Sequence, residues 1–246
     1  MLARATTDDR LPTVARTPRI LDLLRIGQRA DPRAPLLIHG EPGVGKDILA
    51  ALVHDASVRR SHSFIKVNLG AQSAKHHETD LFGHERGASP EATRRRLGSF
   101  EFANHGTLYL DQVGTASCEV VARVVHTVRT GEVARIGGRE TIQVDVRLIA
   151  STSDNAPARA DNGLWQALRG LDAVEICVPP LRERIDEIPV LASFFLERFK
   201  RRYRRDAQLC PDMMSAFQTR SWPGNIRELE EEVHRLFVGE AKAAVR

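Results

Sequence analysis

The segment at positions 40–47 constrains the fold more than any other part of the sequence. It matches the pattern G-x-x-x-x-G-K, follows an apolar run at 36–39 and precedes apolar residues at helical spacing. In such a strand, loop and helix, the glycines let backbone N–H groups turn toward phosphate oxygens, and the helix N-terminus adds partial positive charge. We therefore predict that nucleotide phosphates bind to Gly40, Glu41, Pro42, Gly43, Val44, Gly45, Lys46 and Asp47.

The spacing of the remaining apolar residues predicts an α/β fold. Short apolar runs are separated by segments long enough for helices, and they lie at 36–39, 64–67, 107–110, 147–150 and 174–178. This alternation is typical of a mostly parallel sheet with helices on its faces. A further short helix is predicted around 20–26.

After Pro179 and Pro180 the pattern changes to helices alone, which we predict at 185–205, 211–220 and 225–246. We therefore expect an α/β nucleotide-binding subdomain at 1–184 and a helical subdomain at 185–246.

Two segments do not fit a minimal α/β domain. Residues 80–98 are too polar and too interrupted by Gly and Pro for a core element. Residues 131–144 contain Gly137 and Gly138 between two short runs, which predicts a β-hairpin with a turn of two or three residues. Extra loops on such scaffolds usually carry function.

Composition places the chain among ordinary globular proteins. Hydrophobic residues make up 42% and charged residues 28%. No stretch approaches the roughly 18 apolar residues of a membrane span, and residues 1–10 carry charges where a signal peptide needs an apolar core. We expect a cytoplasmic protein without membrane contact. Cys118, Cys177 and Cys210 are odd in number and widely spaced, so we interpret them as buried free thiols.

A second element of the nucleotide site is predicted at the end of the run 107–110. Asp111 is the expected partner of Mg²⁺, and Lys46 is expected to reach the β and γ phosphate oxygens. Asp47 stands where this motif usually has a hydroxyl residue that holds Mg²⁺. Gln112 cannot accept a proton as a general base, although a glutamine can still orient a water molecule.

Four further segments resemble one known family. They are Leu81-Phe-Gly-His-Glu-Arg-Gly-Ala88, Gly106-Thr-Leu-Tyr-Leu-Asp111, Pro179-Pro-Leu-Arg-Glu-Arg184 and Trp222-Pro-Gly-Asn-Ile-Arg-Glu-Leu229. In content and order they resemble the AAA+ P-loop NTPase domain of bacterial enhancer-binding proteins, the ATPases that activate sigma-54 RNA polymerase. The resemblance runs from about Leu11 to Arg235.

The resemblance implies an α/β subdomain with a C-terminal helical lid, bound ATP and Mg²⁺, and a homo- or hetero-oligomeric ring with ATP between subunits. It implies that the first inserted loop contacts the RNA polymerase sigma factor. Arg227 matches the lid arginine that touches the nucleotide in the family, and Asn68 matches the asparagine that pairs there with a catalytic Glu.

The chain departs from the family where catalysis and sigma-54 contact are expected. Gln112 stands where the family has the catalytic Glu, and Ser153 stands where it usually has an Asn. The family has two arginines before the Pro179 motif that reach the neighbouring site, and this chain offers only Arg169 there. The contact loop has Ser89-Pro-Glu-Ala92 where the family has Phe-Thr-Gly-Ala. A general base contributes about 10²–10⁴ in rate and an arginine finger about 10³–10⁵. We therefore expect weak hydrolysis and a degenerate sigma-54 contact, with Asp111, Gln112 and Arg169 as the catalytic candidates.

Three functional interpretations stay open. The first is an ATP-binding regulator of transcription with impaired hydrolysis and impaired sigma-54 contact. The second is a competent ring ATPase that remodels sigma-54 RNA polymerase. The third is a decayed paralogue that keeps the fold and binds nucleotide weakly. Contact with a different sigma factor is compatible with the first.

A basic run at 200–205 is the densest cluster of positive charge in a chain whose net charge is +4. We interpret it first as a solvated helix face. The second interpretation is phosphate contact, so we expect DNA to bind only weakly or through a partner.

Overall fold

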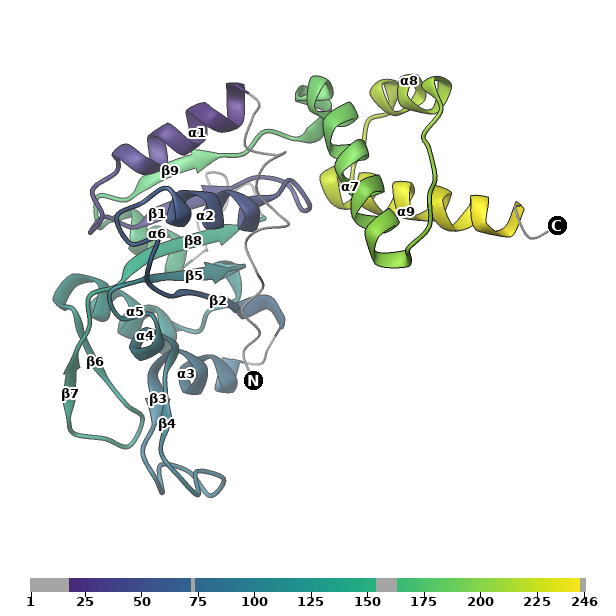
Figure 1. Ribbon diagram of the computed structural model, residues 1–246. Helices are drawn as coiled ribbons and strands as arrows, with labels where there is room; N and C mark the ends of the chain where they lie inside the picture. Colours follow the sequence, from purple (N-terminus) through teal and green to yellow (C-terminus); the bar gives the residue numbers. More distant parts are fainter. Residues whose placement is uncertain (1–17, 72–73, 154–162, 244–246) are drawn as a thin grey trace. The chain divides into compact units, whose positions relative to one another are not determined.

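A five-stranded sheet carries the loops of interest. Its strands are β1 (Leu36–His39), β2 (Phe64–Asn68), β5 (Thr107–Asp111), β8 (Arg147–Thr152) and β9 (Val174–Cys177). In the computed structural model, which describes residues 18–71, 74–153 and 163–243, they follow the order β2-β5-β8-β1-β9, and all neighbours are parallel (Figure 1). The expected parallel sheet is confirmed.

Helices precede and join these strands. They are α1 (Pro18–Arg29), α2 (Lys46–Asp55), α3 (Ala74–Phe82), α4 (Ser99–Phe102), α5 (Cys118–Thr130) and α6 (Gly163–Arg169), with short 3-10 turns at Leu69–Ala71 and Val113–Thr115. The ends of α5 illustrate how the sequence sets the boundaries. Ser117 Oγ accepts from the Val120 N–H, and Gly131 ends the helix at a φ of 71°.

The sheet and its helices enclose one hydrophobic core. Leu37 of β1, Leu108 of β5 and Leu148 of β8 contribute from the strands, and Trp165 of α6 contributes from a helix. These strand side chains share one face of the sheet, and Leu36 and Ile149 on the opposite face are fully buried as well, as a parallel sheet requires.

The first inserted segment differs in part from the prediction. Its first residues belong to α3, where Leu81 and Phe82 are buried in the core, so the expectation that no core element lies within 80–98 was wrong. The short strands β3 (Gly83–His84) and β4 (Arg96–Leu97) then pair antiparallel. In Figure 1 both inserted segments extend away from the sheet on the side where α3 and α4 lie.

The second inserted segment is a hairpin, as predicted, but its turn is longer. β6 (Glu132–Ala134) and β7 (Thr141–Gln143) pair antiparallel and end at Ala134 and Thr141. The backbone of Ile136 instead bonds to Glu85 N–H and to the Gly83 carbonyl. The prediction of a turn of two or three residues was therefore wrong, because the backbone of Ile136 bonds to the first inserted segment and not across the hairpin.

The C-terminal region is helical, as predicted. α7 (Ile188–Tyr203), α8 (Pro211–Thr219) and α9 (Asn225–Ala243) follow 3-10 turns at Leu181–Glu183 and Ile185–Glu187. Leu191, Phe217, Trp222 and Leu229 belong to the hydrophobic core of this region. The Trp222 Nε1 donates to the Phe217 carbonyl at 2.7 Å, which satisfies its buried polar atom.

The chain forms two compact units. One contains Leu23–His39 and Leu49–Cys177, and the other contains Met1–Asp22, Gly40–Ile48 and Val178–Arg246. The phosphate loop therefore groups with the C-terminal helices. The subdomain boundaries 1–184 and 185–246 stay a prediction.

The three cysteines are exposed, so the expectation of buried thiols was wrong. Each lies at the end of an element or beside one: Cys118 begins α5, Cys177 ends the edge strand β9, and Cys210 precedes α8. Apolar neighbours in sequence do not bury a residue at such a place.

Among the described residues no helix is both long and apolar enough to span a bilayer. The charged segment 1–10 lies outside the described residues.

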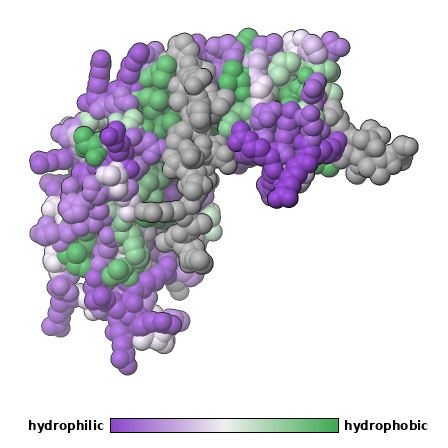
Figure 2. Space-filling view, in the orientation of Figure 1, coloured by the Kyte–Doolittle hydropathy of each residue, from purple (hydrophilic) through white to green (hydrophobic). Residues whose placement is uncertain are grey.

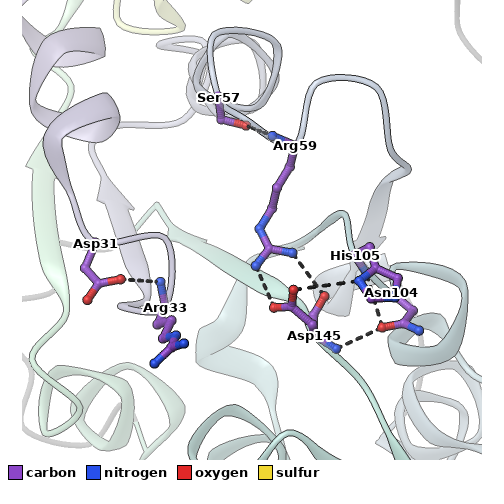
Figure 3. A network of polar contacts seen from close by, with 7 residues as sticks. All are labelled: Asp31, Arg33, Ser57, Arg59, Asn104, His105 and Asp145. Carbon is purple, nitrogen blue, oxygen red and sulfur yellow. Dashed lines mark hydrogen bonds and ion pairs between the residues drawn. The ribbon is translucent and has the colours of Figure 1, made fainter.

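A polar network joins the loops that precede β2, β5 and β8 (Figure 3). Arg59 donates to the Asp145 carboxylate at 2.6 Å and to its carbonyl at 3.1 Å. Asn104 Oδ1 accepts from the Asp145 N–H at 2.8 Å. The Arg59 guanidinium holds the pKa of Asp145 below its usual value.

Replacing Asp145→Asn should lower the free energy of unfolding at neutral pH by about 0.5–1 kcal/mol, since Asp145 is half-exposed and such pairs are partly screened. A lowered folded pKa means that the carboxylate stabilises the fold above its unfolded pKa and that this contribution disappears as pH falls through the folded pKa. The difference from the parent should therefore vanish in acid. Denaturant unfolding at several pH values measures it. Asp172→Asn is the control, and an Asp145→Asn effect that is independent of pH would contradict the role of the charge.

Candidate nucleotide-binding site

The loop after β1 has the backbone conformation that phosphate binding requires. Gly43 and Gly45 have φ values of 79° and 94°, in the left-handed region that favours glycine. A β-carbon on Gly43 would lie 2.3 Å from the carbonyl oxygen of Gly224, so this position accepts no side chain. α2 begins at Lys46, so the N-terminus of a helix follows the loop directly.

Lys46 is nearly buried, with 7% of its surface exposed. Its Nζ donates to the carbonyl oxygens of Gly40 and Glu41 at 2.8 and 2.9 Å. These bonds hold the ammonium group over the loop, where the oxygens of a bound phosphate would meet it.

Asn225, at the start of α9, connects the loop to the C-terminal helices. Its side chain is fully buried, and its Nδ2 donates to Glu41 Oε2 and to the Pro42 carbonyl, both at 3.0 Å. Its Oδ1 accepts from the Leu181 N–H at 2.7 Å. One amide thus joins the loop, the turn after β9 and α9.

Arg182 adds an ion pair to this connection. Its guanidinium donates to both carboxylate oxygens of Glu41, at 2.6 and 2.8 Å. Bonds from Arg182 and then Asn225 lower the pKa of Glu41 to about 2. Glu41 therefore stays ionised, and its role here is to hold the loop rather than to meet phosphate.

Arg184 contacts the backbone of the phosphate loop. It is buried, pairs with the buried Glu187 at 3.1 Å, and donates to the Val44 carbonyl at 3.1 Å. Burial lowers the pKa of this arginine, and Glu187 opposes that effect. A buried pair of this kind is costly to break, because one charge would be left unpaired.

Arg227, the predicted lid residue, lies beside the loop. It is exposed, and its Cβ would lie 3.2 Å from a β-carbon added to Gly43. The Ile226 N–H donates to the Gly43 carbonyl at 3.0 Å. The structure thus brings Arg227 together with the predicted phosphate-binding residues.

Removing the Asn225 amide should lower the free energy of unfolding by about 1–3 kcal/mol, because the Leu181 N–H and the Pro42 carbonyl lose a buried partner. Asn225→Gly isolates this loss, since φ at Asn225 is 55° and glycine accepts that conformation. Denaturant unfolding measures the change. Arg182→Met is the control and should cost less, because that ion pair is partly exposed. If the two variants lose the same free energy of unfolding, the buried amide contributes no more to stability than the exposed ion pair.

Asp111 lies at the end of β5 and is surrounded by polar groups of its own strand and of the neighbouring strands β2 and β8. Ser151 Oγ donates to Asp111 Oδ1 at 2.7 Å, and the Tyr109 hydroxyl lies 3.3 Å from the same oxygen. Lys66 Nζ lies 4.0 Å from Oδ2. Parallel register places Asn68 directly beside Asp111.

Gln112 follows Asp111 in a left-handed conformation, with a φ of 59°. A β-carbon on Gly70 would lie 1.7 Å from Gln112 Oε1, so the Gln112 side chain packs on the Gly70 backbone. Asn68 Oδ1 accepts from the Gly70 N–H at 2.9 Å. The structure therefore gathers Asn68, Gln112 and Asp111 at the ends of β2 and β5.

Arg169 does not join this group. It ends α6 and pairs with Glu175 on β9, a strand that β8 and β1 separate from β5. Ser153 directly follows β8, at the end where Ser151 meets Asp111. Asp47 Oδ1 accepts from the N–H of Ile48 in the first turn of α2.

Mg²⁺ usually binds proteins through one or two carboxylates together with substrate phosphates and waters. A single carboxylate at Asp111 fits an ion held in that way. Among the described residues no group of three or more His, Cys, Asp or Glu side chains could hold a metal by itself.

Several residues around the phosphate loop and around Asp111 were not predicted from the sequence. They are Lys66, Tyr109, Ser151, Arg182, Arg184 and Asn225. Tyr109 and the last three stand inside the quoted motifs, so the motifs could have pointed to them. Period-two alternation from Asp111 would also have placed Tyr109 on the same face of β5.

Comparison with known proteins agrees with this geometry. Residues 14–169 match the sigma-54 interaction domain, and residues 182–246 match the AAA+ ATPase lid domain. The fold is similar to crystal structures of NtrX from Brucella abortus. The complex with ADP has a TM-score of 0.79 and 30% identity, covering 90% of this chain and 50% of that one. The complex with ATP has a TM-score of 0.78 and 27% identity, covering 97% and 50%.

Two relatives of known sequence are similarly close. The Nif-specific regulatory protein of Rhizobium leguminosarum bv. trifolii is 38% identical over 218 residues, which cover 88% of this chain and 61% of that protein. The transcriptional regulatory protein ZraR of Escherichia coli strain K12 is 38% identical over 238 residues, covering 95% and 54%. The chain spans about half to three fifths of the length of these relatives.

The parallel sheet, the glycine loop and the C-terminal helices define an AAA+ ATPase fold with a helical lid. Within that class, the chain belongs to the sigma-54 interaction domain family.

Proposed function

We propose that this chain is the ATP-binding module of a bacterial transcription regulator that acts on sigma-54 RNA polymerase. The observation that carries the proposal is the glycine loop, whose left-handed Gly43 and Gly45 precede Lys46 at the start of α2. The ADP and ATP complexes of NtrX support nucleotide binding, and the names of the relatives support a role in transcription. ATP and Mg²⁺ are the proposed ligands, and a ring of subunits is the proposed assembly.

Hydrolysis is proposed to be weak. Gln112 stands beside Asp111 and Asn68 and cannot accept a proton from water. Arg169, the one catalytic arginine offered by the sequence, is paired with Glu175 in its own chain. A neighbouring subunit would have to compete with Glu175 for it. Both observations favour a module that binds ATP and turns it over slowly.

The sigma-54 contact is proposed to be degenerate as well. The tip of the first inserted segment is a hydrogen-bonded turn in which Ala92 is buried and bonds to the Ser89 carbonyl. Residues 85–95 include no aromatic side chain. An aromatic anchor for a sigma factor is therefore missing from this loop.

Lys46→Ala should abolish ATP binding, because the loop loses the ammonium group that meets the phosphates. Gln112→Glu should raise phosphate release by tenfold or more, since a general base contributes about 10²–10⁴ in rate. Calorimetric titration and a phosphate-release assay on the same samples test both. Arg129→Met, an exposed arginine on α5, is the control. ATP affinity of Lys46→Ala within threefold of the parent would refute the site.

Rapid turnover in the parent chain would favour the competent ring ATPase over our proposal. Failure to bind ATP at millimolar concentration would favour the decayed paralogue. A Gln112→Glu variant that binds ATP normally and gains no turnover would show that another residue limits the reaction.

The basic run at 200–205 gives a test of direct DNA contact. Arg201, Arg202 and Arg204 are exposed, and Figure 2 shows a strongly hydrophilic surface at the end of α7. Lys200 pairs with Glu197 and Asp206, which reduces the local excess of positive charge. We expect replacement of the three exposed arginines by glutamine to weaken any DNA binding and lower its salt dependence without changing ATP affinity. Fluorescence anisotropy with a DNA duplex measures this, and unchanged DNA affinity would remove the run as a contact.

A further inference from the structure

A positively charged side chain lies beside the carboxylate that the proposed function assigns to magnesium. Lys66 is on β2, in register with Tyr109 of β5. Its Nζ lies 4.0 Å from Asp111 Oδ2 and 5.6 Å from the centre of the Tyr109 ring. Lys66, Tyr109 and Asp111 therefore share one face of the sheet.

The two oxygens of Asp111 have different surroundings. Ser151 and Tyr109 are fully buried, and their hydroxyl oxygens lie 2.9 Å apart. Each hydroxyl has one hydrogen to donate. Ser151 gives its hydrogen to Asp111 Oδ1 at 2.7 Å, so the Tyr109 hydroxyl can donate to the Ser151 oxygen. This chain of donors fixes Oδ1 and the orientation of the carboxylate.

Oδ2 is the oxygen that remains on the side of Lys66. The side chain of Lys66 is 41% exposed and that of Asp111 is 18% exposed, so the pair is partly accessible to solvent. A divalent ion that approaches Asp111 there, directly or through a water molecule, comes close to the ammonium group. Like charges repel at such distances even in a partly aqueous setting.

We propose that Lys66 is a positioning residue that acts as a resident cation at Asp111 and competes with the divalent ion. Without metal, Lys66 neutralises the Asp111 carboxylate and so reduces its repulsion of nucleotide phosphates. When the divalent ion is bound, the Lys66 ammonium group must move away from the Asp111 carboxylate or remain close to a second positive charge. Lys66 thereby makes nucleotide binding less dependent on Mg²⁺. The inference rests on the proposed function, since it requires ATP to bind near Asp111.

The test compares ATP affinity with Mg²⁺ and with EDTA, measured by calorimetric titration of the full chain. The dissociation constant in EDTA divided by the dissociation constant with Mg²⁺ reports how strongly the metal and the nucleotide are coupled. Lys66→Met removes the charge and keeps most of the apolar part of the side chain. We expect this ratio to rise by about three- to tenfold, as loss of one nearby, partly screened charge implies.

Three variants serve as controls. Lys66→Arg keeps the charge and should keep the parent ratio. Lys66→Gln, a shorter neutral side chain, should raise the ratio as Lys66→Met does. Lys200→Met removes the same charge from α7 and should leave the ratio unchanged.

The outcomes separate this inference from the proposed function. If ATP binds and Lys66→Met leaves the ratio unchanged, the competition is refuted and the nucleotide site stands. A loss of affinity by the same factor with and without Mg²⁺ would show a structural role and would also refute it. If the parent binds no ATP under either condition, both the proposed function and the inference are overturned.

Discussion

The buried amide of Asn225 is the contact on which the geometry of the phosphate loop depends. A primary amide both donates and accepts, so one side chain satisfies the Leu181 N–H, the Pro42 carbonyl and the Glu41 carboxylate. A threonine hydroxyl, on a side chain of similar size, has one hydrogen to donate, whereas the amide has two and donates to both Glu41 and Pro42. The left-handed backbone at Asn225 places the amide toward the loop, and asparagine adopts that conformation more readily than most residues. The shape of the loop is therefore held by the start of α9 as well as by its own glycines.

The group of polar side chains around Asp111 depends on strand register. Parallel pairing places Asn68 beside Asp111, and the period of two along β5 places Tyr109 on the same face. A shift of one residue in the pairing would move these side chains to opposite faces of the sheet. The burial of Leu108 and Leu110 on the other face fixes that register, so the hydrophobic core determines where the polar groups meet.

Much of the fold could be predicted from the sequence, because apolar runs of four or five residues and the motif at 40–47 specify local structure strongly. The α/β class, the parallel sheet and the C-terminal helices are confirmed. The turn of the second hairpin was wrong because Ile136 bonds to Gly83 and Glu85, and no local pattern reveals such a partner. The contacts of Lys66 and Ser151 with Asp111 were missed for the same reason, since each comes from a different strand. The predicted role of Arg169 stays a prediction, and its pairing with Glu175 depends on the position of β9.

The exposed cysteines have a practical consequence. Cys118 begins α5 in the unit that contains the sheet, and Cys210 precedes α8 in the unit that contains the phosphate loop. Thiol-reactive fluorophores or spin labels can reach both without any engineered cysteine. Replacing Cys177 with serine leaves one attachment point on each unit. The native chain thus offers a pair of labelling positions from which the separation of its two units can be followed in solution as nucleotide is added.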